Sequence, residues 1–201
     1  MPIWQYLLCC IVALELSTAF AWAMVFRSLD DQFQIIALWL VASAAWEVLK
    51  ANTALHGRND LGLSLAYTVA STALLLPILR RWGAGRWAVV SWTVVAVALA
   101  STLAGWIPST VAVAAINACI FLCAQSILSR RNSKQISGVA LAIGVFAFSS
   151  AVFNATLLHF WRMAPCLAWT FWFVRCGFVV LGYVLLFWVA ASFYGVHRDQ
   201  S

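Results

Sequence analysis

The stretch QIIALWLVASAAWEVLKANTALHGRND, residues 34–60, decides the class of fold. Its first part is apolar and uncharged, Glu47 and Lys50 then occur inside the same run, and the polar residues HGRND end it. An apolar run of about 20 residues is the length of a helix that crosses the hydrocarbon layer of a bilayer. The stretch therefore predicts a membrane-spanning helix that carries two charges and ends in a polar loop.

The composition extends this prediction to the whole chain of 201 residues. Hydrophobic residues make up 65% of the chain and charged residues 9%, whereas a soluble domain carries roughly 25% charged residues. A chain with so little polar surface needs lipid as its solvent, and in lipid only helices and closed barrels pair every backbone group. The apolar runs are continuous rather than alternating, which excludes a barrel. We therefore predict an all-α, polytopic membrane protein in which residues 1–201 form a single transmembrane domain.

Seven apolar runs separated by short polar segments predict a seven-transmembrane-helix bundle. The predicted spans are residues 3–26, 34–56, 61–79, 87–107, 109–129, 136–160 and 166–194. Pro108 and Pro165 fall at predicted helix starts, where a missing N–H is tolerated, and Pro77 predicts a kink near the end of the third span. In a closed bundle of seven helices, the first, second and seventh are expected to be neighbours.

The distribution of Lys and Arg between the connecting segments predicts the orientation of the bundle. Eight lie on one side, namely Arg27, Arg80, Arg81, Arg86, Arg130, Arg131, Lys134 and Arg198. Two lie on the other side, Arg58 and Arg162. Because cytoplasmic loops are enriched in Lys and Arg, this bias predicts an outside N-terminus and a cytoplasmic C-terminus in a cell inner membrane. The first span lacks a basic leading region and a cleavage signal, so we expect it to be retained.

Four ionisable residues fall inside the predicted spans: Glu15, Glu47, Lys50 and Arg175. A charge at the centre of a spanning helix costs about 2.5–3.5 kcal/mol, so these residues need partners, water or protonation. At about 1.5 Å of rise per residue, all four lie between the midplane and the outer third of the membrane. The sequence therefore predicts one charged layer in the outer half of the bundle.

Two interpretations of this layer remain open. In the first, it is a structural network in which Glu47 pairs with Lys50 on one helix face and Glu15 forms an intramembrane salt bridge with Arg175 between helices. In the second, it is a polar pocket that opens outward and binds an ion, a proton or a small anionic or zwitterionic ligand.

Further candidate ligand-binding residues accompany the charged layer. They are Trp46, Asn52, His56, Asp60, His159, Arg162 and Trp172. The histidines, Asp60 and Arg162 belong to segments that we expect to form an outer vestibule, and Trp172 is close enough to Arg175 in sequence for a cation–π contact. We predict no metal site, because histidine at a membrane interface is most often a polar tip in the headgroup zone. No cofactor is identified, since the last span has no lysine for a retinal Schiff base.

Weaker polar signals occur in three other spans. In the third span, Ser64, Thr68 and Thr72 recur every four residues, with Tyr67 and Ser71 beside them. We expect this stripe to pack against another helix, with the lining of a pathway as the less favoured alternative. The amides of Asn117 and Gln125, and the Ser150 and Asn154 pair, are expected to bond across helices.

No catalytic motif or nucleophile constellation accompanies these residues, so an enzyme is the less favoured class, although the sequence leaves the question open. One hypothesis is a small protein that transports or senses a polar solute, an ion or a proton. The other is a non-catalytic subunit or scaffold of a larger membrane complex, with an associated pigment or cofactor as one possibility. The lipid bilayer is the expected partner in both. Nucleic acid is not expected, because the basic residues form short clusters between apolar runs.

Overall fold

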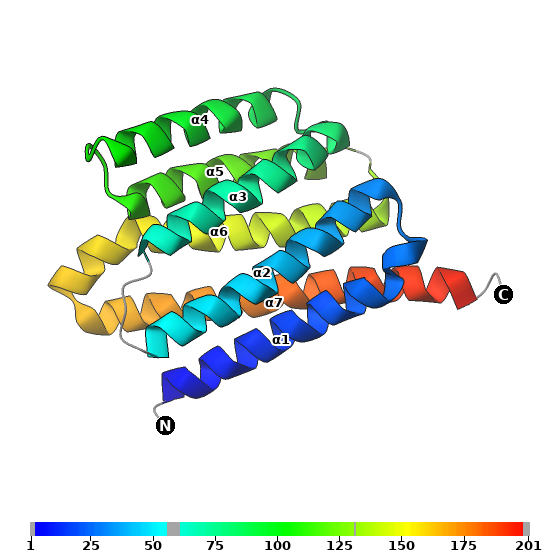
Figure 1. Ribbon diagram of the computed structural model, residues 1–201, viewed down its shortest axis with the longest axis horizontal. Helices are drawn as coiled ribbons and strands as arrows, with labels where there is room; N and C mark the ends of the chain where they lie inside the picture. Colours follow the sequence, from blue (N-terminus) through cyan, green and yellow to red (C-terminus); the bar gives the residue numbers. More distant parts are fainter. Residues whose placement is uncertain (1–2, 56–60, 131, 199–201) are drawn as a thin grey trace.

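In the computed structural model (Figure 1), residues 3–55, 61–130 and 132–198 are described, with side chains described for 6–49, 64–130, 132–156, 164, 166–167 and 169–194. Within these residues the chain forms seven α-helices: α1 Ile3–Val25, α2 Asp31–Leu55, α3 Leu61–Leu79, α4 Arg86–Leu103, α5 Ser109–Leu128, α6 Lys134–Met163 and α7 Pro165–Arg198. A 3-10 turn (η1, Phe26–Ser28) follows α1, and a π-helical turn (η2, Arg80–Ala84) follows α3. The predicted all-α class and the number of helices are confirmed.

Six of the seven helices form a ring. In order around it, α1 contacts α2, α2 contacts α3, α3 contacts α5, α5 contacts α6, α6 contacts α7, and α7 returns to α1. The fourth helix lies at one edge of the bundle, against α5 and α3 (Figure 1). The expected contacts of the first helix with the second and seventh are confirmed, but the bundle closes with six helices rather than seven.

The helices are of membrane-spanning length and composition. Six of them are long and apolar enough to cross a bilayer, and among the described residues α3 is not in that set. Many of their outward side chains are large and apolar, such as Phe20, Val97 and Trp188, which a water-soluble surface does not favour. The chain is therefore a multi-pass membrane protein. The seventh span, α3, stays a prediction.

Proline and glycine set several helix ends. Pro108 precedes the first residue of α5 and Pro165 begins α7, as predicted. The fourth span was expected to reach residue 107, but α4 ends at Leu103 because Gly105 adopts a φ of 74°. The N–H of Gly105 donates to the carbonyl of Thr102 (3.0 Å) and that of Trp106 to the carbonyl of Ser101 (2.9 Å). These bonds satisfy the last carbonyls of the helix, which is the usual role of a left-handed glycine at that position.

An aromatic cluster fills one half of the bundle, the half that contains the C-terminal end of α7. Its members are Trp22, Phe33, Trp82 and Phe193. The ring of Phe33 lies 4.9 Å from that of Phe193 and 5.5 Å from that of Trp82, measured between ring centroids. The indole N–H of Trp22 donates to the carbonyl of Leu186 (3.0 Å). Large rings with a satisfied N–H thus pack against one another in this half of the bundle.

Candidate functional site

The other half of the bundle contains a pocket of about 410 Å³. Its lining comes from the six helices of the ring and not from α4. On α1, α3, α5 and α7 the lining begins in the N-terminal part of the helix and reaches its middle or somewhat beyond, and on α2 and α6 it begins nearer the middle and extends toward the C-terminal part. Because successive helices run in opposite directions (Figure 1), these segments meet in the same half of the bundle. The pocket and the aromatic cluster thus occupy different parts of the same helices, such as α1, α2 and α7.

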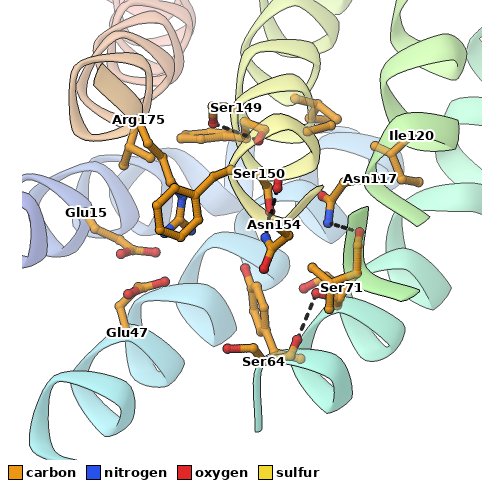
Figure 2. Close-up of a pocket in the computed structure, with 18 of the residues that line it drawn as sticks. Glu15, Glu47, Ser64, Ser71, Asn117, Ile120, Ser149, Ser150, Asn154 and Arg175 are labelled. Carbon is orange, nitrogen blue, oxygen red and sulfur yellow. Dashed lines mark hydrogen bonds between the residues drawn. The ribbon is translucent and has the colours of Figure 1, made fainter. Parts of the chain in front are cut away.

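Two carboxyl groups face each other in this pocket. Glu15 projects from α1 and is only 1% exposed, and Glu47 projects from α2 and is partly exposed. Figure 2 shows their carboxyl groups pointing toward one another on one side of the pocket. The hydroxyl of Tyr183 interacts with the Glu15 carboxyl from α7. The arrangement brings together two acidic groups that lie 32 residues apart in the sequence.

Arg175 also lines the pocket, but it does not form the predicted ion pair. Among the described side chains no salt bridge is present, and the guanidinium instead lies over the ring of Phe153 on α6, with Cζ 4.7 Å from the ring centroid. A planar guanidinium stacks well on an aromatic face, which explains why the contact is with a ring. The predicted contact with Trp172 is likewise replaced by Phe153. The expected Glu47–Lys50 pair lies outside the described side chains.

A tyrosine on α3 joins the hydroxyl groups of α3 to those of α2. The hydroxyl of Tyr67 lies 2.6 Å from Oγ of Ser43 on α2 and also bonds with Ser71 on its own helix. The Tyr67 ring stacks on that of Trp46, with centroids 5.6 Å apart and planes inclined by 20°. These contacts hold α2 against α3 on the side where Glu47 projects.

The hydroxyl side chains of the α3 stripe line the pocket. Its five residues, Ser64, Tyr67, Thr68, Ser71 and Thr72, all contribute to the lining. Thr68 and Thr72 satisfy their hydroxyl hydrogens on carbonyls one turn earlier in the same helix, at 2.8 and 2.7 Å. The stripe expected to pack against another helix does so through Tyr67, which bonds Ser43 on α2, and the same residues also line the pocket.

Of the amides expected to bond across helices, those of Asn117 and Asn154 bond within their own helices. The amide nitrogen of Asn117 donates to the carbonyl of Val113 (2.9 Å), and that of Asn154 donates to the carbonyl of Ser150 (2.8 Å). Both asparagines line the pocket, on the side away from the carboxyl pair (Figure 2). A local carbonyl is always within reach of such a side chain, whereas a partner on another helix depends on how the helices pack.

Three rings line the pocket toward the aromatic cluster, and we call them the aromatic floor. They are Trp39, Phe146 and Tyr183. The Phe146 ring lies 4.8 Å from that of Tyr183 and 6.5 Å from that of Trp39. Gly182 allows this packing, because a Cβ at that position would lie 2.6 Å from the Phe146 ring. The Nε1 of Trp39 is buried and has no hydrogen-bond partner among the described residues.

The remaining predicted site residues are distributed as follows. Trp172 lines the pocket, whereas Trp46 stacks on Tyr67 without belonging to the lining. The side chains of Lys50, Asn52, His56, Asp60, His159 and Arg162 lie outside those described. The predicted vestibule therefore stays a prediction. No group of three metal-ligating side chains occurs within the described part of the chain.

No family model, no curated protein and no solved structure matches the chain in comparisons with known proteins. What the site can bind therefore follows from its own geometry. Its features are a cavity inside a membrane bundle, a pair of facing carboxyl groups, a guanidinium held on a ring, and walls of hydroxyl, amide and aromatic side chains.

Proposed function

We propose that the protein binds a small polar or charged solute in this pocket and either transports it across the membrane or senses it. The observation that carries the proposal is a polar-walled cavity of about 410 Å³ inside the bundle. This volume falls in the range of roughly 300–1,000 Å³ that is typical of ligand sites. Ionisable groups that face such a cavity inside a membrane mark ligand or ion pathways more often than lipid contacts.

The polar contacts favour a binding site over a purely structural network. A network that holds helices together uses its polar groups on one another, with little space between them. Here Asn117 and Asn154 bond within their own helices, Arg175 rests on a ring, and all three line an open volume. A cavity with polar walls in the membrane interior requires water or a ligand to satisfy those walls.

The basic residues support an orientation for this pocket. Apart from Arg175 in the pocket, those with described side chains are exposed and lie in or next to the connections in the same half as the aromatic cluster: Arg27, Arg80, Arg81, Arg86, Arg130 and Lys134. By the bias of Lys and Arg toward the cytoplasm, that end is cytoplasmic and the N-terminus lies outside. On this view the protein has seven spans in a cell inner membrane. The pocket occupies the outer half, and the aromatic cluster lies between the pocket and the cytoplasm.

The alternative function, a non-catalytic subunit of a larger membrane complex, rests on outward aromatic side chains such as Trp169, Phe173 and Trp188 of α7. Lipid accounts for the same side chains, because aromatic residues are common on the outer surface of spanning helices. No described contact favours a protein partner over lipid, so solute binding is the function that we put forward.

Thermal unfolding of the detergent-purified protein with a panel of ions, amines, carboxylates and neutral metabolites tests this function. A ligand at 100 times its Kd stabilises a folded protein by about 2.7 kcal/mol, which is measurable as a rise in Tm. We expect at least one compound to stabilise the wild type and to lose most of this effect in Glu47→Gln. The matched control is Asp31→Asn, which removes a carboxylate from the exposed start of the same helix and is expected to retain the effect. If no compound raises the Tm, or if both variants respond like the wild type, the proposed binding site is wrong.

A further inference from the structure

The hydroxyl groups of three residues on one side of the pocket donate their hydrogens to their own helices. Those of Thr68 and Thr72 donate to carbonyls of α3, at 2.8 and 2.7 Å. That of Ser149 donates to the carbonyl of Phe146 on α6, at 3.0 Å. All three hydroxyl residues line the pocket. A hydroxyl group has one hydrogen and two lone pairs, so an oxygen that has already donated offers the cavity only acceptor capacity.

The two asparagines on the same side of the pocket show a related arrangement. The amide nitrogen of Asn117 donates to the carbonyl of Val113 (2.9 Å). That of Asn154 donates to the carbonyl of Ser150 (2.8 Å) and to its hydroxyl oxygen (3.3 Å). An amide oxygen in the place of either nitrogen would repel the backbone carbonyl, which fixes the orientation of both amides. Because the nitrogen faces the helix backbone, the amide oxygen is the end of each side chain that is left for the cavity.

These side chains form one neutral surface, which we call the acceptor wall. Its five residues are Thr68, Thr72, Asn117, Ser149 and Asn154. They belong to α3, α5 and α6, which are neighbours in the ring, and none of them is ionisable. Donor capacity remains on one N–H of Asn117 and on the lining hydroxyls of Ser64, Ser71 and Ser150, so acceptors outnumber donors on this side. An oxygen in the membrane interior needs a donor from water or from a ligand.

The aromatic floor adjoins the acceptor wall. Ser149 follows Phe146 by three residues on α6, so the two lie on one face of that helix. The Phe146 ring in turn lies against the rings of Trp39 and Tyr183. Aromatic faces bury hydrocarbon and stack on flat groups. A molecule that donates hydrogen bonds to the acceptor wall can therefore place its apolar part on the aromatic floor.

From these observations we propose that the ligand is a hydrogen-bond donor: an organic solute with at least two O–H or N–H groups on one edge, as in a polyol or an amide. These groups donate to the amide oxygens of Asn117 and Asn154, and the hydrocarbon part of the solute contacts the aromatic floor. This inference rests on the proposed function and names the ligand class of the same site. Recognition by the acceptor wall is independent of the charges elsewhere in the pocket, because none of its five side chains titrates.

A diol and its methyl ethers test the ligand class on the wild-type protein, with binding measured by calorimetry in detergent. The compounds are 3-phenylpropane-1,2-diol, its monomethyl ethers and its dimethyl ether. Methylation removes the hydrogen of a hydroxyl group and keeps the oxygen. We expect each methylation to weaken binding by about 3- to 10-fold, because one hydrogen bond to the acceptor wall is lost. A dimethyl ether that binds as tightly as the diol, or a diol that does not bind, overturns the inference.

Variants of the asparagines then locate the recognition of the donors. Asn117→Leu and Asn154→Leu keep a side chain of similar size and remove the amide oxygen, so each should reduce the affinity ratio of diol to dimethyl ether by about 3- to 10-fold. A purely structural role would change the affinity for both compounds alike. Gln125→Leu is the control, because Gln125 is exposed on the same helix as Asn117 and does not line the pocket. If Asn154→Leu fails to fold, Asn117→Leu and the wild-type series still decide the question.

A matched pair of threonines extends the test to the hydroxyl groups. Thr68 and Thr102 both donate to a carbonyl one turn earlier at 2.8 Å, but Thr102 belongs to α4, outside the pocket. We expect Thr68→Val to lower the preference for the diol and Thr102→Val to leave it unchanged. An unchanged preference in both Asn117→Leu and Thr68→Val overturns the inference.

Oxygen atoms also coordinate hard cations, so the Tm of the wild type is measured with NaCl and KCl as well. Stabilisation by Na⁺ or K⁺ that disappears in Asn117→Leu overturns the inference in favour of a metal cation. If the broad panel stabilises the protein and the preference for the diol is absent, the ligand class fails alone. Silence of the whole panel refutes the proposed function itself.

Discussion

The two halves of the bundle are built on the same helices and differ in what fills them. On α1, the inward positions Glu15 and Trp22 are two turns apart on one face, and both are almost completely buried, at 1% and 0% exposure. Around Trp22 the space is filled by rings and the indole N–H is satisfied. Around Glu15 there is a polar cavity. The comparison indicates that side-chain volume and polarity along one helix stripe decide whether packed rings or a polar cavity surround it.

The substitution with the largest expected effect is Trp22→Ala, which would open a cavity in the half that contains the aromatic cluster. It removes a fully buried ring and the bond to the Leu186 carbonyl, and changes of this kind cost about 3–5 kcal/mol. The free energy of unfolding in mixed micelles measures the loss. Trp188→Ala is the control, since Trp188 is 57% exposed on the outside of α7 and is expected to change stability by less than about 1 kcal/mol. Equal losses in the two variants would contradict the view that the aromatic cluster is the stable part of the bundle.

Gly182→Ala acts at the boundary between the halves and has the next largest expected effect. The added Cβ would lie 2.6 Å from the Phe146 ring, which then has to shift within the aromatic floor. Such overpacking costs about 1–3 kcal/mol, and we also expect weaker ligand binding, because Phe146 lines the pocket.

The same helix offers a matched control for this prediction. A Cβ at Gly177 meets no atom within 4 Å, so Gly177→Ala should leave ligand affinity unchanged and raise stability by up to about 1 kcal/mol through helix propensity. Both variants are compared by Tm and by binding of the panel compound that stabilises the wild type. A Gly182→Ala protein with normal stability and affinity would show that the floor is loosely packed.

Tyr67→Phe has the smallest expected effect on stability, and it changes only the half of the bundle that contains the pocket. It retains the ring that stacks on Trp46 and removes the hydroxyl that bonds Ser43 across helices. A typical hydrogen bond contributes about 0.5–1.5 kcal/mol, so we expect a loss of that size in unfolding free energy. Ser43→Ala should give a similar loss, and the double variant should lose little more than either single one, as a double-mutant cycle measures. Strict additivity of the two losses would refute the contact between these side chains.

Much of the fold could be predicted from particular residues. Runs of apolar residues predicted the helices, and Pro108 and Pro165 predicted two of the starts, because a proline restricts its own backbone wherever the chain folds. The end of α4 was missed by four residues. Gly105 was the available signal, since a glycine after an apolar run and before Pro108 commonly ends a helix.

The candidate site was less predictable, because its contacts join residues of different helices. The sequence placed Glu15, Glu47 and Arg175 at similar depths, but it led to an ion pair between Glu15 and Arg175 that is not formed. It also led to bonds across helices for Asn117 and Asn154, which bond within their own helices instead. Sequence spacing tells which residues share a helix face, and it does not tell which residue of another helix lies opposite.

The sequence by itself determined that this is a helical membrane protein with ionisable groups inside its spans, because hydropathy and helix periodicity are local properties of the chain. Only the tertiary structure decided that six helices form the ring and that α4 stays outside it. It alone decided that the carboxyl group of Glu47 meets that of Glu15, and that the partner of Arg175 is the Phe153 ring. These contacts depend on how helices from distant parts of the chain rotate and pack against one another, which no single helix encodes.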